Sequence, residues 1–165
     1  MSHPEIRTGL GWDVHRIAAG RPLILGGVTI PSDFGLAGHS DADILLHAVT
    51  DALLGAAALG DIGMHFPDTD VQWKGAASGL FLEHAVRLVK QAGFALVNVD
   101  STILLERPKL KDYRLAIRES LAKTLGLSLD RVSVKFKTAE GVGPVGEGLS
   151  AEAQAIVTLS REVSR

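Results

Sequence analysis

The sequence predicts an α/β (α+β) sandwich: a mixed β-sheet with three main helices on one face, formed by residues 1–165 as a single domain. Helix and strand patterns are interleaved along the chain, and no linker, repeat or low-complexity tract divides its 165 residues. The hydrophobic fraction is 46%, with only five Phe, two Trp and one Tyr. The apolar residues are therefore mainly aliphatic and numerous enough for a full core, which argues against intrinsic disorder.

The N-terminal part predicts a strand, a hairpin and a helix. Residues 6–17 form the strand, in which Gly9 and Gly11 indicate a bulge or a close backbone approach. Residues 22–31 form a hairpin around Gly26-Gly27, because glycine supplies the positive φ of a tight turn. A loop is expected at 32–39, and residues 40–43 then supply cap candidates and first-turn acids for a helix over 44–60, which stops at 60–63.

The remaining chain predicts two helices and three strands. Residues 64–78 have the polar composition of a loop, and amphipathic helices follow at 79–92 and 113–125, each ended by a glycine. The residues rich in β-branched side chains at 95–106, 131–138 and 150–160 predict strands. A proline-centred turn lies at 107–113 and a glycine-rich loop at 139–148.

Composition excludes several classes of protein. The chain has no cysteine, so neither disulfides nor thiolate metal sites are available. A net charge of −2 gives no global attraction to nucleic acid or to an anionic membrane. The N-terminus lacks the apolar core of a secretory signal, and the apolar run at 52–60 is too short to span a bilayer. We therefore expect a cytoplasmic protein with neither nucleic acid nor membrane as a partner.

A candidate metal site begins at Asp13 and His15, which a strand projects from the same face. His47 on the predicted helix is the best third ligand, and two histidines with one carboxylate leave a zinc position open for substrate. Asp51, one helical turn further on, could orient a histidine from behind. The residues alone leave the alternative open, in which Asp13 and His15 are a surface pair and His47 is a hydrogen-bonded, partly buried side chain.

Two further groups suit phosphate chemistry. His39 and Ser40 precede the predicted helix, whose N-terminus attracts anions, although a cap and a loop histidine would have the same pattern. Thr138 could donate to a phosphate oxygen and Glu140 could hold Mg²⁺, while solvated charges at a strand end remain the alternative. The glycine-rich loop is neither a Walker A motif nor a dinucleotide fingerprint.

The motifs occur in a familiar order: GWDVHR, LILGGVTIP, GHSDADILLHAVTDALLGAAALGDIG, HFPDTD, RPKL and KTAEG. In this order the chain resembles the 2-C-methyl-D-erythritol 2,4-cyclodiphosphate synthase family, from about Ile6 to Leu159. The resemblance implies a homotrimer with active sites between subunits. It also implies a cyclising phosphorus-oxygen lyase of the non-mevalonate isoprenoid pathway, which converts 4-diphosphocytidyl-2-C-methyl-D-erythritol 2-phosphate to the cyclic diphosphate and releases CMP.

The resemblance also implies roles for individual residues. Asp13, His15 and His47 would bind one zinc ion, and Glu140 would bind Mg²⁺ or Mn²⁺. His39 and Thr138 would be catalytic, and Ser40 would contact phosphate. The methylerythritol part would meet Asp61, Ile62, Gly63, Phe66, Pro67, Asp68, Thr69 and Asp70. The cytidine pocket, formed largely by backbone groups, would comprise Leu105, Glu106, Arg107, Pro108, Lys109, Leu110 and Lys111, with Lys137 as a further substrate-binding residue.

The chain departs from the family pattern in the loop at 141–148. This loop is shorter and lacks an aromatic residue and an arginine, so the roles of those residues near the trimer axis, including an isoprenoid-diphosphate site, are not carried over.

Two other functions share much of the residue set. One is a zinc-dependent phosphoesterase, which needs an activated water, and the other is a non-enzymatic metal- or nucleotide-binding module.

Overall fold

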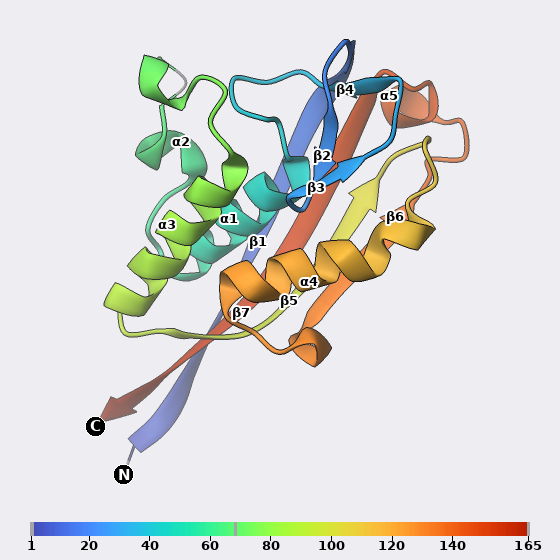
Figure 1. Cartoon of the computed structure of the whole chain (residues 1–165). Coiled ribbons are helices and arrows are strands. Elements are labelled where there is room, and N and C mark those ends of the chain that lie inside the picture. Colours follow the sequence, from blue (N-terminus) through green and yellow to red (C-terminus); the bar gives the residue numbers. More distant parts are fainter. Residues whose placement is uncertain (1, 68, 165) are drawn as a thin grey trace.

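The protein, in a computed structural model that describes residues 2–67 and 69–164, is built on a five-stranded mixed sheet (Figure 1). The strand order is β4-β1-β7-β5-β6, in which only β5 and β6 are parallel neighbours. The strands are β1 (Ser2–Ala19), β4 (Phe34–Leu36), β5 (Ala95–Leu104), β6 (Val132–Lys137) and β7 (Ser150–Ser164). A separate hairpin joins β2 (Leu23–Leu25) and β3 (Val28–Ile30). The predicted mixed sheet in an α+β fold is confirmed.

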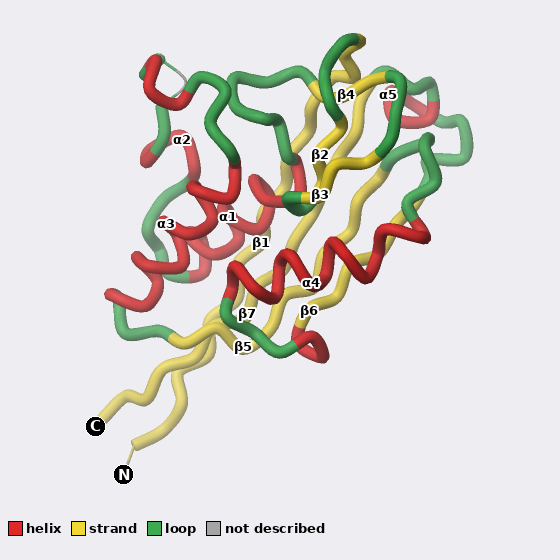
Figure 2. Tube along the Cα trace, viewed as in Figure 1, coloured by secondary structure: helices red, strands yellow, loops and turns green. Residues whose placement is uncertain are grey.

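Three long helices lie in front of the sheet in the view of Figures 1 and 2: α1 (Ile44–Ala56), α3 (Ser78–Gln91) and α4 (Arg114–Leu125). Helix α1 packs on β1 and β7, α4 packs on β6, and α3 packs mainly on α1. The short helices are α2 (Ile62–His65) and α5 (Gly143–Gly146), with 3₁₀ turns at Val71–Trp73, Lys111–Tyr113 and Leu129–Arg131. Aliphatic side chains fill the core between helices and sheet, among them Leu53, Leu82 and Ile103.

The sequence missed three short elements and misplaced the ends of others. Strand β4 lies inside the predicted loop at 32–39, because its three residues are stabilised by pairing with the end of β1 rather than by local pattern. The short helices α2 and α5 lie where only a stop signal and a loop were expected. Strands β1 and β7 exceed their predicted lengths because they pair with each other from Ser2↔Ser164 to Arg16↔Ser150.

Helix α1 begins at residue 44, as predicted, and ends earlier than predicted, at Ala56. It starts at Ile44, so the acidic residues precede the first turn instead of lying within it. The cap is Asp43, whose carboxylate accepts a hydrogen bond from Leu46 N–H at 3.1 Å. The same buried carboxylate accepts from Gly26 N–H at 2.9 Å and Gly27 N–H at 2.6 Å. Asp43 therefore joins the hairpin turn to the start of α1, and its burial raises its pKa to about 6.

The two glycines of β1 allow the strand to lie directly against α1. A Cβ atom at Gly11 would lie 1.8 Å from the carbonyl oxygen of Ala48, and one at Gly9 would lie 2.1 Å from that of Ala52. The predicted close backbone approach is confirmed. Because side chains alternate along a strand, the face that carries these glycines continues to Asp13 and His15. Both side chains are thereby directed toward α1.

Among the residues that the structure describes, no helix combines the length and apolar character needed to cross a membrane.

Candidate metal centre and two pockets

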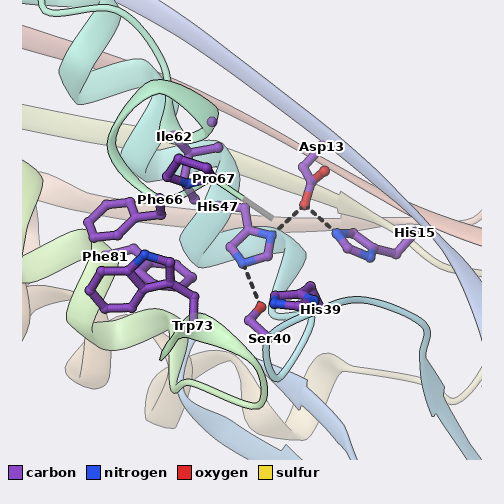
Figure 3. Close-up of a pocket in the computed structure, with 11 residues that line it drawn as sticks. Asp13, His15, His39, Ser40, His47, Ile62, Phe66, Pro67, Trp73 and Phe81 are labelled. Carbon is purple, nitrogen blue, oxygen red and sulfur yellow. Dashed lines mark hydrogen bonds and ion pairs between the residues drawn. The ribbon is translucent and has the colours of Figure 1, made fainter. Parts of the chain in front are cut away.

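Asp13, His15 and His47 meet at one point between β1 and α1 (Figure 3). Asp13 Oδ2 lies 3.0 Å from His15 Nε2 and 2.9 Å from His47 Nδ1. One candidate ligand atom from each residue lies within 4.8 Å of the others. The strand contributes two of the side chains and the helix contributes the third, so the close approach at the glycines brings the three together.

The arrangement fits a transition-metal ion such as zinc. Bonds of about 2.0 to 2.1 Å put neighbouring ligand atoms of a tetrahedral zinc about 3.3 Å apart, close to the observed separations. The Ala37 carbonyl accepts a hydrogen bond from His15 Nδ1, which fixes the neutral ring with a lone pair on Nε2. That lone pair faces the Asp13 carboxylate at 3.0 Å, so the two atoms would repel each other unless a cation or a proton lies between them.

Charge at the centre follows from burial and from these contacts. The side chains of Asp13, His15 and His47 are 23%, 17% and 12% exposed. Burial acts to raise the pKa of Asp13, but the adjacent imidazole rings of His15 and His47 outweigh that effect and hold the pKa well below its usual range. Burial acts to lower the pKa of His15, but Asp13 and the Ala37 carbonyl raise it overall. Asp13 therefore stays ionised and favours a cation beside it.

The metal centre opens into a pocket of 520 Å³, called here the metal pocket. Figure 3 shows an aromatic wall of Phe66, Trp73 and Phe81 on the side of His47 away from His15. The Phe66 ring centroid lies 4.4 Å from that of Phe81 and 5.0 Å from that of Trp73. The remaining lining residues are Asp13, His15, His39, Ser40, His47, Ile62, Gly63 and Pro67. The lining of this pocket therefore includes the candidate metal ligands, the expected phosphate contacts and part of the expected methylerythritol site.

Other residues expected near the methylerythritol part lie outside this lining. Asp61 is exposed and caps α2 by accepting from Met64 N–H at 2.9 Å. Asp70 caps the 3₁₀ turn at Val71–Trp73, and Thr69 is exposed. Asp68 lies outside the described residues. Their predicted contacts with substrate stay predictions.

Asp51 holds the wall of the pocket in place. Its Oδ1 atom accepts a hydrogen bond from Ile62 N–H at 2.8 Å, which ties α1 to the start of α2. Within the described part of the chain, the Asp51 carboxylate accepts a hydrogen bond from this amide and not from a histidine. The orienting role expected of Asp51 stays a prediction, whereas its contact with Ile62 places it directly behind the lining.

A second pocket of 210 Å³, the loop pocket, lies at the ends of β5 and β6. Most of its lining was predicted, and Arg114 and Phe136 complete it, with the guanidinium of Arg114 5.2 Å above the Phe136 ring. The predicted residues that line it are Leu105, Pro108, Lys109, Leu110, Lys111, Lys137 and Thr138. The described linings of the two pockets have no residue in common.

Three predicted residues beside the loop pocket do not line it and instead form hydrogen bonds with other residues of the chain. Glu106 accepts a hydrogen bond from Ala139 N–H at 3.0 Å. Arg107 donates to Asp33 at 2.9 Å. Glu140 has a positive φ of 52° and accepts from the Thr138 hydroxyl at 2.7 Å. Thr138 and Glu140 are thus adjacent to each other, but they do not line the metal pocket.

Comparison with known proteins gives the family of the chain. Residues 6–160 match the model of the YgbB family. The chain belongs to the YgbB family. A protein of Solibacter usitatus named 2-C-methyl-D-erythritol 2,4-cyclodiphosphate synthase is 74% identical to this YgbB chain, over 95% of the chain and 99% of that protein.

Solved structures agree with this family assignment. A structure of 2C-methyl-D-erythritol-2,4-cyclodiphosphate synthase in a CDP-bound form superposes with a TM-score of 0.86 and 46% identity, over 93% of this chain and 99% of the other. The bifunctional IspDF from Campylobacter jejuni superposes with a TM-score of 0.93 and 43% identity, over 96% of this chain but only 43% of that longer protein.

The YgbB chain also places residues at the site that the sequence did not single out. Arg21 donates to the carbonyl oxygens of Gly38 at 2.8 Å and Ser40 at 2.7 Å, which holds the loop that carries His39. Ser78 contacts His47 at 2.8 Å, and Trp73 and Phe81 form the aromatic wall. Phe81 lies in the helix predicted at 79–92, so the sequence predicts its secondary structure. The sequence does not show that its side chain lines a pocket. No local pattern marks Arg21.

Proposed function

We propose that the chain is a 2-C-methyl-D-erythritol 2,4-cyclodiphosphate synthase. It converts 4-diphosphocytidyl-2-C-methyl-D-erythritol 2-phosphate to 2-C-methyl-D-erythritol 2,4-cyclodiphosphate and CMP in the non-mevalonate isoprenoid pathway. The observation that carries the proposal is the 74% identity to a relative of that name, over 99% of the relative's length. The three converging metal ligands beside a pocket support it independently.

The reaction joins two groups of one molecule. An oxygen of the 2-phosphate attacks the β-phosphorus of the diphosphate, the bond from that phosphorus to the oxygen bridging the α-phosphate breaks, and CMP leaves. No water is consumed, and the enzyme is thus a cyclising phosphorus-oxygen lyase. Because nucleophile and leaving group are already linked, positioning and charge neutralisation are the main tasks of the protein.

The metal pocket would receive the diphosphate. Asp13, His15 and His47 would hold zinc, and Glu140 would hold Mg²⁺ or Mn²⁺, in keeping with its hard carboxylate oxygens. The bound metals would supply Lewis acidity and positive charge at phosphate oxygens. His39 and Ser40, which line the same pocket, would bind phosphate on the side next to His47.

The aromatic wall and the loop pocket would bind the rest of the substrate. Phe66 and Ile62 border the metal ligands, where they would bind methylerythritol carbon atoms and exclude the water that would otherwise hydrolyse the diphosphate. The loop pocket would bind cytidine, and the CDP-bound relative supports a cytidine nucleotide as ligand. The Thr138 hydroxyl at its edge would donate to the transferring phosphoryl group.

We also propose a homotrimer in which the metal pocket of one subunit faces the loop pocket of the next. The outer face of the sheet supports an assembly, because Leu10 and Ile156 are paired neighbours on β1 and β7 that are 68% and 50% exposed, with Trp12 and Val14 exposed beside them. The separation of the two pockets supports a shared site. A head-to-tail contact that repeats around a ring would bring them together three times.

Phosphorus NMR separates the three candidate functions. With the diphosphocytidyl substrate, zinc and Mg²⁺, we expect the cyclic diphosphate and CMP. Orthophosphate would instead indicate a zinc-dependent phosphoesterase, and unchanged substrate would indicate a non-enzymatic metal- or nucleotide-binding module. Elemental analysis of the purified protein identifies the bound metal, and light scattering measures the mass of the assembly.

Subunit mixing tests the shared site. His47→Ala disables the metal pocket and Thr138→Ala disables the loop pocket, so each variant alone is inactive or nearly so. If sites form between subunits, unfolding and refolding an equal mixture restores about one quarter of wild-type activity, because one site in four pairs two intact pockets. No recovery in a mixture shown to contain hybrid assemblies would place both pockets of a site on one chain.

The cytoplasmic location and the absence of nucleic-acid and membrane partners stay predictions.

A further inference from the structure

A buried serine lies directly behind the metal centre. Ser78 is the first residue of α3, and its side chain is fully buried. Its Oγ atom lies 2.8 Å from His47 Nε2, on the opposite side of the ring from Asp13. The same Oγ atom donates to Asp41 Oδ1, and the backbone N–H of Ser78 donates to Asp41 Oδ2 at 3.1 Å.

The directions of these hydrogen bonds follow from the chemistry of the groups. An ionised carboxylate only accepts, so the single hydroxyl hydrogen of Ser78 points to Asp41. A lone pair of Ser78 Oγ then remains for His47, so His47 must donate from Nε2–H. In the neutral ring the proton is therefore on Nε2, and the lone pair of Nδ1 points at the cluster beside Asp13. This is the form of His47 that can bind a metal ion.

We propose that Ser78 and Asp41 are positioning residues that select the metal-binding tautomer of His47 and fix its ring. The inference rests on the metal ligands of the proposed function, but not on the substrate. A carboxylate that orients a ligating histidine directly is a common arrangement, and here a serine hydroxyl is inserted between the two. Ser40 Oγ also contacts His47 Nε2, at a longer 3.2 Å, and accepts from Ala42 N–H.

The arrangement has a second, purely structural component that a test must separate. The bond from Ser78 N–H to Asp41 satisfies a free amide at the start of α3, and it would stabilise the helix without any metal. Ser78→Ala retains this backbone bond and removes only the hydroxyl. A change in metal binding in that variant therefore reports the connection to His47 and not the helix end.

The experiment measures zinc affinity by competition with a chromogenic chelator. We expect Ser78→Ala to raise the zinc dissociation constant about 10- to 100-fold, the range found when partners of metal ligands are removed. Ser101→Ala is the matched control. Ser101 is another buried serine, on β5, and its hydroxyl donates a hydrogen bond to the carbonyl oxygen of Ser133 at 2.9 Å. Its zinc affinity should equal that of the wild type.

A spectroscopic measurement tests the tautomer itself. In zinc-loaded wild-type protein, ¹⁵N-edited NMR should show the His47 proton on Nε2, in slow exchange with water, and zinc on Nδ1. In Ser78→Ala that proton should exchange at least about tenfold faster, because it has lost its main acceptor. Asp41→Asn, which keeps the size of the side chain and removes one acceptor oxygen, should also weaken zinc binding and serves if Ser78→Ala fails to fold.

The outcomes distinguish this inference from the proposed function. Unchanged zinc affinity in a folded Ser78→Ala, or zinc on Nε2 of wild-type His47, overturns the inference even if the enzyme makes the cyclic diphosphate. Weakened zinc binding with the expected proton on Nε2 supports it even if the diphosphocytidyl substrate is not converted. Wild-type protein that binds no zinc overturns both the metal assignment and the role of Ser78.

Discussion

The metal pocket and the loop pocket are built in different ways. In the metal pocket, side chains from β1, α1 and α3 bond to one another, so that Asp13, His47 and Ser78 form a continuous chain of polar contacts. In the loop pocket, a turn after β5 and the end of β6 enclose a smaller space, and the Thr138 hydroxyl donates a hydrogen bond to its near neighbour Glu140. A metal site needs fixed side chains within one fold, whereas a nucleotide pocket can be shaped by backbone and completed by another molecule.

The largest expected effect comes from removing a metal ligand. His47→Ala should lose zinc and turn over substrate at least about 10²-fold more slowly, more than the loss expected for a partner behind a ligand. The protein should remain folded, because the side chain lies at the edge of the pocket and not in the aliphatic core. Elemental analysis and circular dichroism check both parts. Full zinc occupancy in the variant would show that His47 is not a ligand.

A change in the loop pocket should reduce activity without affecting the metal. Thr138→Ala removes a donor proposed to act on the transferring phosphoryl group, which should lower kcat about 10²-fold. Its zinc content should equal that of the wild type, because Thr138 does not line the metal pocket. Zinc lost together with activity would contradict the division into two pockets.

The contact of β1 with α1 can be tested by adding one methyl group. Gly11→Ala would place a Cβ atom 1.8 Å from the Ala48 carbonyl oxygen, so strand and helix must separate. We expect about 3 kcal/mol of destabilisation, because overpacking against backbone has little room to relax.

Gly55→Ala is the matched control, since a Cβ atom there meets nothing within 4 Å. Because Gly55 lies in α1, alanine should stabilise the fold by about 0.5 to 1 kcal/mol. Urea denaturation gives both values. If Gly11→Ala is as stable as the wild type, the glycine is not what lets the strand approach the helix.

The smallest effect concerns the metal-free centre and its pH dependence. Folding lowers the pKa of Asp13 from 3.8 and raises that of His15 from 6.5. The contribution of Asp13 to stability is present above pH 3.8 and is lost as pH falls through its folded pKa. The contribution of His15 is present below pH 6.5 and is lost as pH rises through its folded pKa.

In chelator-treated protein, the Tm difference between the wild type and Asp13→Asn should therefore be greatest between about pH 4 and 6.5 and amount to a few degrees. Differential scanning calorimetry across that range measures it. A difference that increases steadily above pH 8 would show that the ionised Asp13 and His15 pair is not its source.

The sequence predicted the candidate metal centre better than the rest of the site, because the three side chains named for it do converge. Asp13 and His15 share a face because strand side chains alternate, and that local rule holds in β1. The same rule could not reveal Ser78, because a serine at the start of a helix has many ordinary explanations and its contact with His47 spans 31 positions. The short strand β4 was missed for a similar reason, since its hydrogen bonds come from β1 and not from its own pattern.

By itself, the sequence determined the helix and strand pattern of the long elements and the absence of thiolate ligands, and it predicted the three side chains that meet at the candidate metal centre. These features follow from local periodicity and from the chemistry of single residues, and both can be read from a short segment of the sequence. Only the tertiary structure decided that Asp43 joins the hairpin to α1, that Ser78 and Asp41 lie behind His47, and that the two pockets are separate. Those features depend on contacts between distant segments, and such contacts form only when the whole core is packed.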